Sequence, residues 1–146
     1  MENAAKDLLR VAKHVAAASL PRLTWSVNSA DNDPWSLAKE AGINILSNKD
    51  FVCGHIVDGE FVSAIFNYAD SDEYEFDIAV HPMWQRKGLG SKLLDVAISE
   101  FDNYADAYGE DFVFSVDAVN KHMVKMLKRK GFFITEKHGG HTMMSR

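Results

Sequence analysis

The segment Val80–Leu94, VHPMWQRKGLGSKLL, limits the fold more than any other part of the sequence. Before it, residues 74–80 alternate between apolar and other side chains, a pattern that predicts a strand. After it, apolar residues recur at helical spacing from about residue 90 to 104, which predicts a long helix. A strand that enters a helix through a glycine-rich turn can bring the free amides of the first helical turn next to an anion. We therefore expect an anion-binding turn here.

Two glycines and two cations in this turn suit a pyrophosphate group. Gly88 and Gly90 leave room for an anion to lie against the backbone amides, while Arg86 and Lys87 add positive charge at the rim. The turn lacks the third glycine of the dinucleotide fingerprint and the GK[ST] end of a nucleoside triphosphate loop. A tight strand-to-helix turn with solvated cations is the alternative interpretation of the same residues.

The rest of the chain predicts strands and helices on both sides of this turn. We expect strands at 51–57, 61–68, 112–116, 132–136 and 141–144, and helices at 2–18, 34–41 and 122–130. Asp58-Gly59 predicts a tight turn between the first two strands. A hairpin followed by β-α-β-α-β-β predicts one mixed α/β (or α+β) domain over residues 1–146, with a helical N-terminal segment of about residues 1–45.

The composition limits which binding partners and which cellular compartment we expect for the protein. A formal net charge of −5 argues against a nucleic-acid partner. The sequence has no apolar run of membrane-spanning length, and its first residues do not resemble the apolar core of a signal peptide, so we expect a cytoplasmic protein without a membrane partner. The single cysteine, Cys53, excludes an internal disulfide. His138 and His141 offer two metal ligands where zinc needs three or four, so no metal site is expected. The oligomeric state stays open, a homodimer included.

Two motifs carry a resemblance to a known family. The string Val80-x-Pro82-x-x-Gln85-Arg86-x-Gly88-x-Gly90 resembles the acetyl-CoA signature of the GNAT superfamily of N-acetyltransferases. That signature is Gln or Arg, two residues, Gly, one residue, and Gly or Ala, after a strand ending in Val-x-Pro. Asn120, followed by Gly131-Phe132, resembles the second segment of the family, a helix that ends in Gly-Phe. Two motifs in the family's order are more specific than either one alone.

The resemblance implies a fold and a coenzyme site. The fold would be a mixed, mostly antiparallel central sheet flanked by helices and splayed between two central parallel strands, here 74–80 and 112–116. Acetyl-CoA would be the cosubstrate. Asn120 would bond the pantetheine arm or nearby backbone, although a helix N-cap is an alternative role for it. The backbone amides implied for the pantetheine arm are those of Ile78, Ala79 and Val80, and those implied for the pyrophosphate belong to Arg86, Lys87, Gly88, Leu89, Gly90 and Ser91.

The resemblance also implies direct acetyl transfer to a primary amine of a small molecule or protein. A base must take the proton of the ammonium group, and an acid can protonate the leaving thiolate. Glu75 is the first candidate base and Asp77 the second; a solvated strand face is the alternative for both. The tyrosine that often serves as the acid is replaced by Leu127, which cannot donate a proton. Tyr74, Tyr68 or water remain for that role, with packing as the alternative for the two tyrosines.

Two other functions fit the same residues. Leu127 favours a binding module that keeps the acyl-CoA site with weak or no catalysis. An interaction protein would use the fold as a scaffold and dock a partner through the helix at 2–18 or the basic helix at 122–130. If the protein is an enzyme, the acceptor stays open between small amines, antibiotics, amino acids, protein N-termini and lysine side chains.

Overall fold

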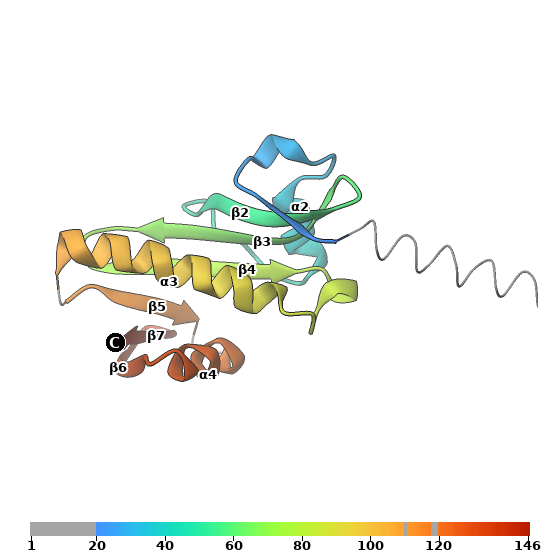
Figure 1. Ribbon diagram of the computed structural model, residues 1–146. Coiled ribbons are helices and arrows are strands. Elements are labelled where there is room, and N and C mark those ends of the chain that lie inside the picture. Colours follow the sequence, from blue (N-terminus) through green and yellow to red (C-terminus); the bar gives the residue numbers. More distant parts are fainter. Residues whose placement is uncertain (1–19, 110, 118–119) are drawn as a thin grey trace, which may run out of the picture.

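The computed structural model describes residues 20–109, 111–117 and 120–146, so the helix predicted at 2–18 lies outside the described residues. The described chain forms a seven-stranded sheet with the order β1-β2-β3-β4-β5-β7-β6 and three α-helices (Figure 1). Among the strands that the structure describes, only β4 and β5 pair in parallel, and all other neighbours are antiparallel. The elements are β1 (Arg22–Thr24), α2 (Pro34–Glu40), β2 (Asp50–Val57), β3 (Glu60–Ala69), β4 (Glu73–Val80), α3 (Leu89–Tyr108), β5 (Val113–Asp117), α4 (Lys121–Arg129), β6 (Phe133–His138) and β7 (His141–Ser145).

The predicted fold class is confirmed, and local signals explain most of its elements. Asp58 and Gly59 have φ angles of 50° and 79°, as the two-residue turn between β2 and β3 requires. Asp33 caps α2 by accepting a hydrogen bond of 2.7 Å from the amide of Trp35. The short edge strand β1 was not predicted, because three residues are too few to show a period of two.

Helix α3 is longer than the range of about residues 90–104 that the spacing of apolar residues predicted. It continues to Tyr108, where Gly109 ends it with a φ of 92°. The rings of Tyr104 and Tyr108 stack with centroids 6.4 Å apart, and both lie against Phe112, which precedes β5. Packing against Phe112 therefore explains the additional helical turn.

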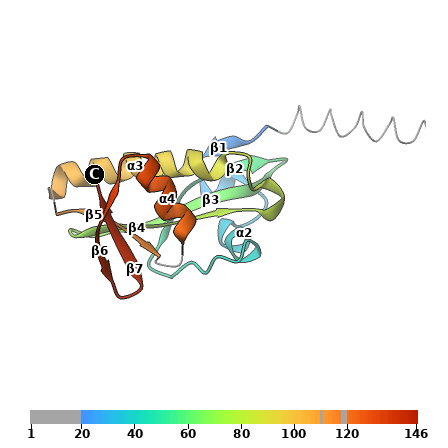
Figure 2. The same cartoon turned by 90° about the horizontal axis from the view of Figure 1, so that it is seen from below.

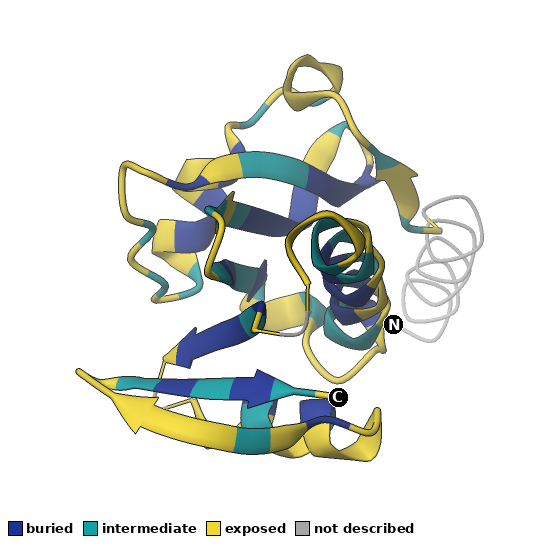
Figure 3. Cartoon of the chain, turned by 90° about the vertical axis from the view of Figure 1, so that its left-hand side faces the viewer, coloured by how far each residue is buried: buried dark blue, intermediate teal, exposed yellow. Residues whose placement is uncertain are grey.

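Helices cover both faces of the sheet. Figure 2 shows α3 on one side of the central strands and α2 on the other. The larger apolar core joins the sheet to α3 and α4, and a smaller one lies under α2. The alternation predicted for β4 is present: Tyr74 and Phe76 belong to the larger core and Ala79 to the smaller one. Figure 3 shows the buried residues in the central strands and exposed residues along the edge strand β6.

The two central parallel strands separate after three residue pairs. Residues 73–75 of β4 pair with residues 113–115 of β5, whereas β3 pairs with β4 without interruption as far as Val80. Beyond Glu75, the second edge of β4 has no strand partner among the described residues. The splay expected between these strands is therefore present. The continuous register also keeps Glu75 and Asp77 on the face opposite Tyr74 and Phe76.

None of the helices that the structure describes is both long and apolar enough to cross a membrane.

Candidate active site

A cavity of about 680 Å³ lies where β4 and β5 separate. The end of β4 contributes Ile78 and Val80 to its wall, and the following turn contributes Gly88 and Gly90. Helix α4 and the chain just after α2 complete the wall. The cavity therefore joins the segments that carry the two sequence motifs, which lie about 30 residues apart in the chain.

The turn between β4 and α3 has an unusual backbone. Arg86 and Gly88 have φ angles of 62° and 84°, in the left-handed region. This conformation costs a non-glycine residue on the order of 1 kcal/mol, and such strain often accompanies functional loops. Gly88 is the N-cap of α3 and has no side chain to cap the helix. Within the part of the chain that the structure describes, no hydrogen bond uses the amides of residues 88–91. These amides and the helix dipole form a site suited to an anion.

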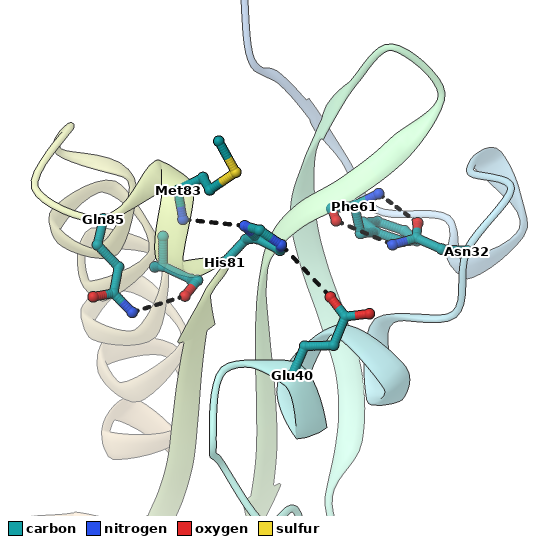
Figure 4. Close-up of polar contacts among 7 residues, drawn as sticks. Asn32, Glu40, Phe61, His81, Met83 and Gln85 are labelled. Atoms are coloured by element: carbon teal, nitrogen blue, oxygen red, sulfur yellow. Dashed lines mark hydrogen bonds and ion pairs between the residues drawn. The ribbon is translucent and has the colours of Figure 1, made fainter.

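Side chains fix the end of β4 just before this turn. Gln85 donates a hydrogen bond of 3.1 Å from Nε2 to the carbonyl oxygen of Val80 (Figure 4). His81 accepts one of 3.1 Å at Nδ1 from the amide of Met83, and its Nε2 lies 3.6 Å from a carboxylate oxygen of Glu40 in α2. The ring of His81 is therefore directed toward α2.

Asn120 joins the second motif to the cavity. Its side chain accepts a hydrogen bond of 3.1 Å from the amide of Met123, so Asn120 is the N-cap of α4, as the alternative interpretation expected. The same residue lines the cavity. Three further lining residues in α4, His122, Met123 and Met126, were not predicted.

The candidate coenzyme residues fall into two groups. Ile78, Val80, Arg86, Gly88, Gly90, Ser91 and Asn120 line the cavity, whereas Ala79, Lys87 and Leu89 do not. The side chains of Ala79 and Leu89 are buried in the core. The ammonium of Lys87 lies 5.5 Å from the ring centroid of Trp84, a lining residue. Arg129 and Lys130 add further cations to the wall.

The two candidate bases lie on the α2 side of β4, outside the wall of this cavity. Lys49, from the segment before β2, is only 8% exposed and places its ammonium 2.8 Å from Asp77 and 4.0 Å from Glu75. The two carboxylates are 25% and 16% exposed, respectively. This face of the strand is thus a partly buried ion-pair cluster and not a solvated surface. Sequence reasoning missed Lys49, because a lysine in a polar segment carries no signal of its partner.

Glu73 extends the row of carboxylates along the same face. Burial raises the pKa of Glu73, and the neighbouring carboxyl groups of Glu75 and Asp70 raise it further, while the hydroxyl of Ser115 acts in the opposite direction. Like charges that face one another disfavour simultaneous ionisation. The row therefore contains one carboxyl with an increased affinity for a proton beside Glu75.

The structure leaves no phenol or thiol in the described wall of the cavity. Tyr74 is fully buried, its hydroxyl accepts a hydrogen bond of 3.1 Å from Asn67, and burial raises its pKa. Burial also raises the pKa of Cys53 to about 12. Leu127 is fully buried in the larger core. Tyr68 is 36% exposed and stands opposite Glu75 on β3.

Comparisons with known proteins agree on one family. The sequence model of the acetyltransferase (GNAT) family matches residues 16–132. A probable acetyltransferase from meticillin-resistant Staphylococcus aureus has a similar structure, with a TM-score of 0.60, 17% identity, and coverage of 83% of this chain and 96% of that one. A GNAT family acetyltransferase from Elizabethkingia anophelis with acetyl-CoA bound has a TM-score of 0.57, 16% identity, and coverage of 85% and 93%. At these identities the structures show a shared fold. No curated protein sequence matches this chain.

Proposed function

Because the chain belongs to the GNAT family of acetyltransferases, we propose that it is an acetyl-CoA-dependent N-acetyltransferase that moves an acetyl group directly to a primary amine of a small molecule or protein. Acetyl-CoA is the cosubstrate of the family, and one structural neighbour holds it. The observation that carries this proposal is the cavity at the splay of β4 and β5, whose wall includes the uncapped start of α3.

In this proposal the coenzyme binds through the backbone. The amides of residues 86–91 hold the pyrophosphate, with the charge of Arg86 nearby. The pantetheine arm lies along the unpaired edge of β4 and bonds to the backbone of residues 78–80, as an added strand would. Asn120 caps α4 with its side-chain oxygen, and its side-chain NH2 group bonds to the pantetheine arm. The thioester then lies in the gap between β4 and β5.

Acetyl transfer from an ammonium acceptor removes two protons from the nitrogen and delivers one proton to the coenzyme thiolate. A base removes a proton from the ammonium group of the acceptor, and the neutral amine attacks the thioester carbonyl. The new C–N bond forms as the C–S bond breaks. The attacking nitrogen then gives up its second proton, and the coenzyme leaves as a thiolate that takes up a proton. Glu75 and Asp77 are the candidate bases. Water or His122 supplies the proton to the thiolate, since Leu127 occupies the position of the usual tyrosine.

A binding module without catalysis is the second candidate function. It is favoured by a specific observation: the described wall of the cavity contains no phenol, and Leu127 is fully buried in the core. A missing acid reduces a rate by roughly 10²–10⁴-fold, so a protein with this wall can bind acyl-CoA and transfer its acyl group slowly.

Two measurements on the purified protein separate these functions. Titration calorimetry with acetyl-CoA measures binding, and release of free thiol from acetyl-CoA in the presence of a panel of primary amines measures transfer. The proposed enzyme binds the coenzyme and releases thiol only when an amine is present. Binding without amine-dependent release supports the binding module. An absence of binding rejects both and supports a scaffold that docks a partner.

A further inference from the structure

A buried lysine, Lys49, lies close to two carboxylates of β4, those of Glu75 and Asp77. Lys49 ends the segment that follows α2, and its amide donates a hydrogen bond of 3.1 Å to the carbonyl oxygen of Leu46, which fixes the turn before β2. Its ammonium donates a hydrogen bond of 2.8 Å to Oδ2 of Asp77. The nearest oxygen of Glu75 is 4.0 Å away, beyond hydrogen-bonding distance. Lys49 therefore forms a hydrogen-bonded ion pair with one candidate base, Asp77, but not with the other, Glu75.

We propose that Lys49 is a positioning residue that engages Asp77 in a permanent ion pair and so leaves Glu75 as the carboxylate that takes the proton from the acceptor amine. This inference rests on the proposed acetyltransferase function. It assigns separate roles to two carboxylates that the sequence alone could not distinguish.

The geometry disfavours Asp77 as the base. A proton placed on Asp77 would leave a lysine ammonium that is only 8% exposed without its bonded anion, which is costly in a partly buried site. The side chain of Glu75 makes no hydrogen bond to Lys49. Its carboxyl group instead shares a hydrogen bond with the carboxyl group of Glu73, so no fixed cation occupies it.

Other charged and polar groups share this environment. On β4, Glu73 precedes Glu75 on the same face, and α2 packs on this side of the sheet with two charged residues, Lys39 and Glu40, that are exposed. The register places further titratable or polar side chains on the same face or in the loop beside it: Tyr68 of β3, Asp70, Ser115 and Asp117 of β5, and His141 of β7. Lys49 supplies a permanent positive charge among these carboxylates.

The test compares Lys49→Met with Lys49→Arg and with Lys137→Met, a control at an exposed position of β6. Without the ammonium, carboxyl groups on this face are protonated more easily, so the acidic limb of the kcat/KM profile for the amine moves to higher pH by about one unit. Lys49→Arg restores the limb. Lys137→Met leaves it unchanged. Calorimetry with acetyl-CoA gives the wild-type affinity for all three variants, because Lys49 lies outside the wall of the coenzyme cavity.

A double variant keeps the test decisive if Lys49→Met folds poorly. Lys49→Met/Asp77→Asn removes both members of the ion pair together and leaves no unpaired ammonium beside Glu75. It should retain measurable amine-dependent thiol release, within about tenfold of the wild type, whereas Glu75→Gln should lose about 10²-fold or more. Equal losses for Lys49→Met/Asp77→Asn and Glu75→Gln, or a wild-type pH profile for Lys49→Met, overturn the inference alone. An absence of thiol release by the wild-type protein overturns the proposed function with it.

Discussion

A β-carbon added to Gly90 would lie 3.8 Å from Cγ2 of Val80, an ordinary van der Waals contact. The folded protein therefore has room for a methyl group at position 90, and the backbone there is not in the left-handed region. Gly90 is the second residue of α3 and lines the cavity. The absence of a side chain at this position thus serves no packing need that the structure shows.

Gly90→Ala should separate stability from coenzyme binding. Alanine favours the helix over glycine by up to about 1 kcal/mol, so the free energy of unfolding should stay the same or rise. The added methyl group would occupy space that the proposed pyrophosphate needs, and the Kd for acetyl-CoA should rise at least tenfold. Thermal melting and titration calorimetry measure the two effects. Unchanged affinity in a stable variant would remove Gly90 from the proposed site.

Gly88→Ala, unlike Gly90→Ala, should lower the stability of the protein. Gly88 has a φ of 84°, where an L-residue is strained by roughly 1–2 kcal/mol, although an added β-carbon would meet no other atom within 4 Å. We therefore expect the free energy of unfolding to fall by about that amount, as measured by urea denaturation. A larger β-branched residue should cost more. If Gly88→Ala is as stable as the wild type, the left-handed turn is not maintained in solution.

Leu127→Tyr should not create the missing acid. Leu127 is a fully buried residue of α4 in the larger core, and its carbonyl oxygen accepts a hydrogen bond of 3.0 Å from the amide of Phe132. A phenol at this position overpacks the core, which typically costs 1–3 kcal/mol. We expect a lower melting temperature and no faster thiol release. Faster release at a wild-type melting temperature would show that position 127 reaches the reacting atoms.

Local patterns were sufficient to predict the centre of the fold. The alternation of β4, the glycine turn and the apolar stripe of α3 are each set by residues close together in the chain, and the turn at Asp58-Gly59 requires only two residues. The anion-binding turn follows from the same patterns and supplies much of the wall of the cavity, whereas the coenzyme itself was predicted from the family resemblance. The predicted splay followed from the family resemblance and not from periodicity.

Contacts between distant segments could not be predicted in this way. Lys49 and Asp77 are 28 residues apart, and neither one indicates the other in the sequence. His122 enters the wall of the cavity only because α4 starts directly after β5 and lies against the gap. The register of β4 also decides which carboxylates share a face with α2, and a single bulge would have reversed that assignment.

Glu73→Gln should stabilise the protein at neutral pH. The pKa of Glu73 is raised above its ordinary value of 4.5, first by burial and then by Glu75. The folded state therefore binds this proton more tightly than the unfolded state, and the associated stability is present at low pH and lost as the pH rises through the folded-state value. Gln cannot ionise, so the melting temperature of the variant should exceed that of the wild type at pH 7.5 and match it near pH 4. Glu136→Gln, at an exposed position of β6, is the control and should show no such difference.

His55 should make the protein less stable in mild acid. Its ring is 5% exposed, and its Nδ1 lies 2.6 Å from the hydroxyl oxygen of Ser63 on the neighbouring strand. Burial lowers the pKa of His55 below its ordinary value of 6.5, and the charge of Lys92 lowers it further.

The unfolded chain therefore takes up this proton at a higher pH than the folded protein does. Stability that is present above pH 6.5 is lost as the pH falls from there toward the folded-state pKa of His55. His55→Asn keeps a polar atom near Ser63 and cannot be protonated, so its melting temperature should fall less than that of the wild type between pH 7.5 and pH 5. The exposed His138 provides the matched control, since His138→Asn should preserve the wild-type slope. If the melting temperature falls equally with pH for the wild type and for His55→Asn, protonation of His55 is not the cause of the acid sensitivity.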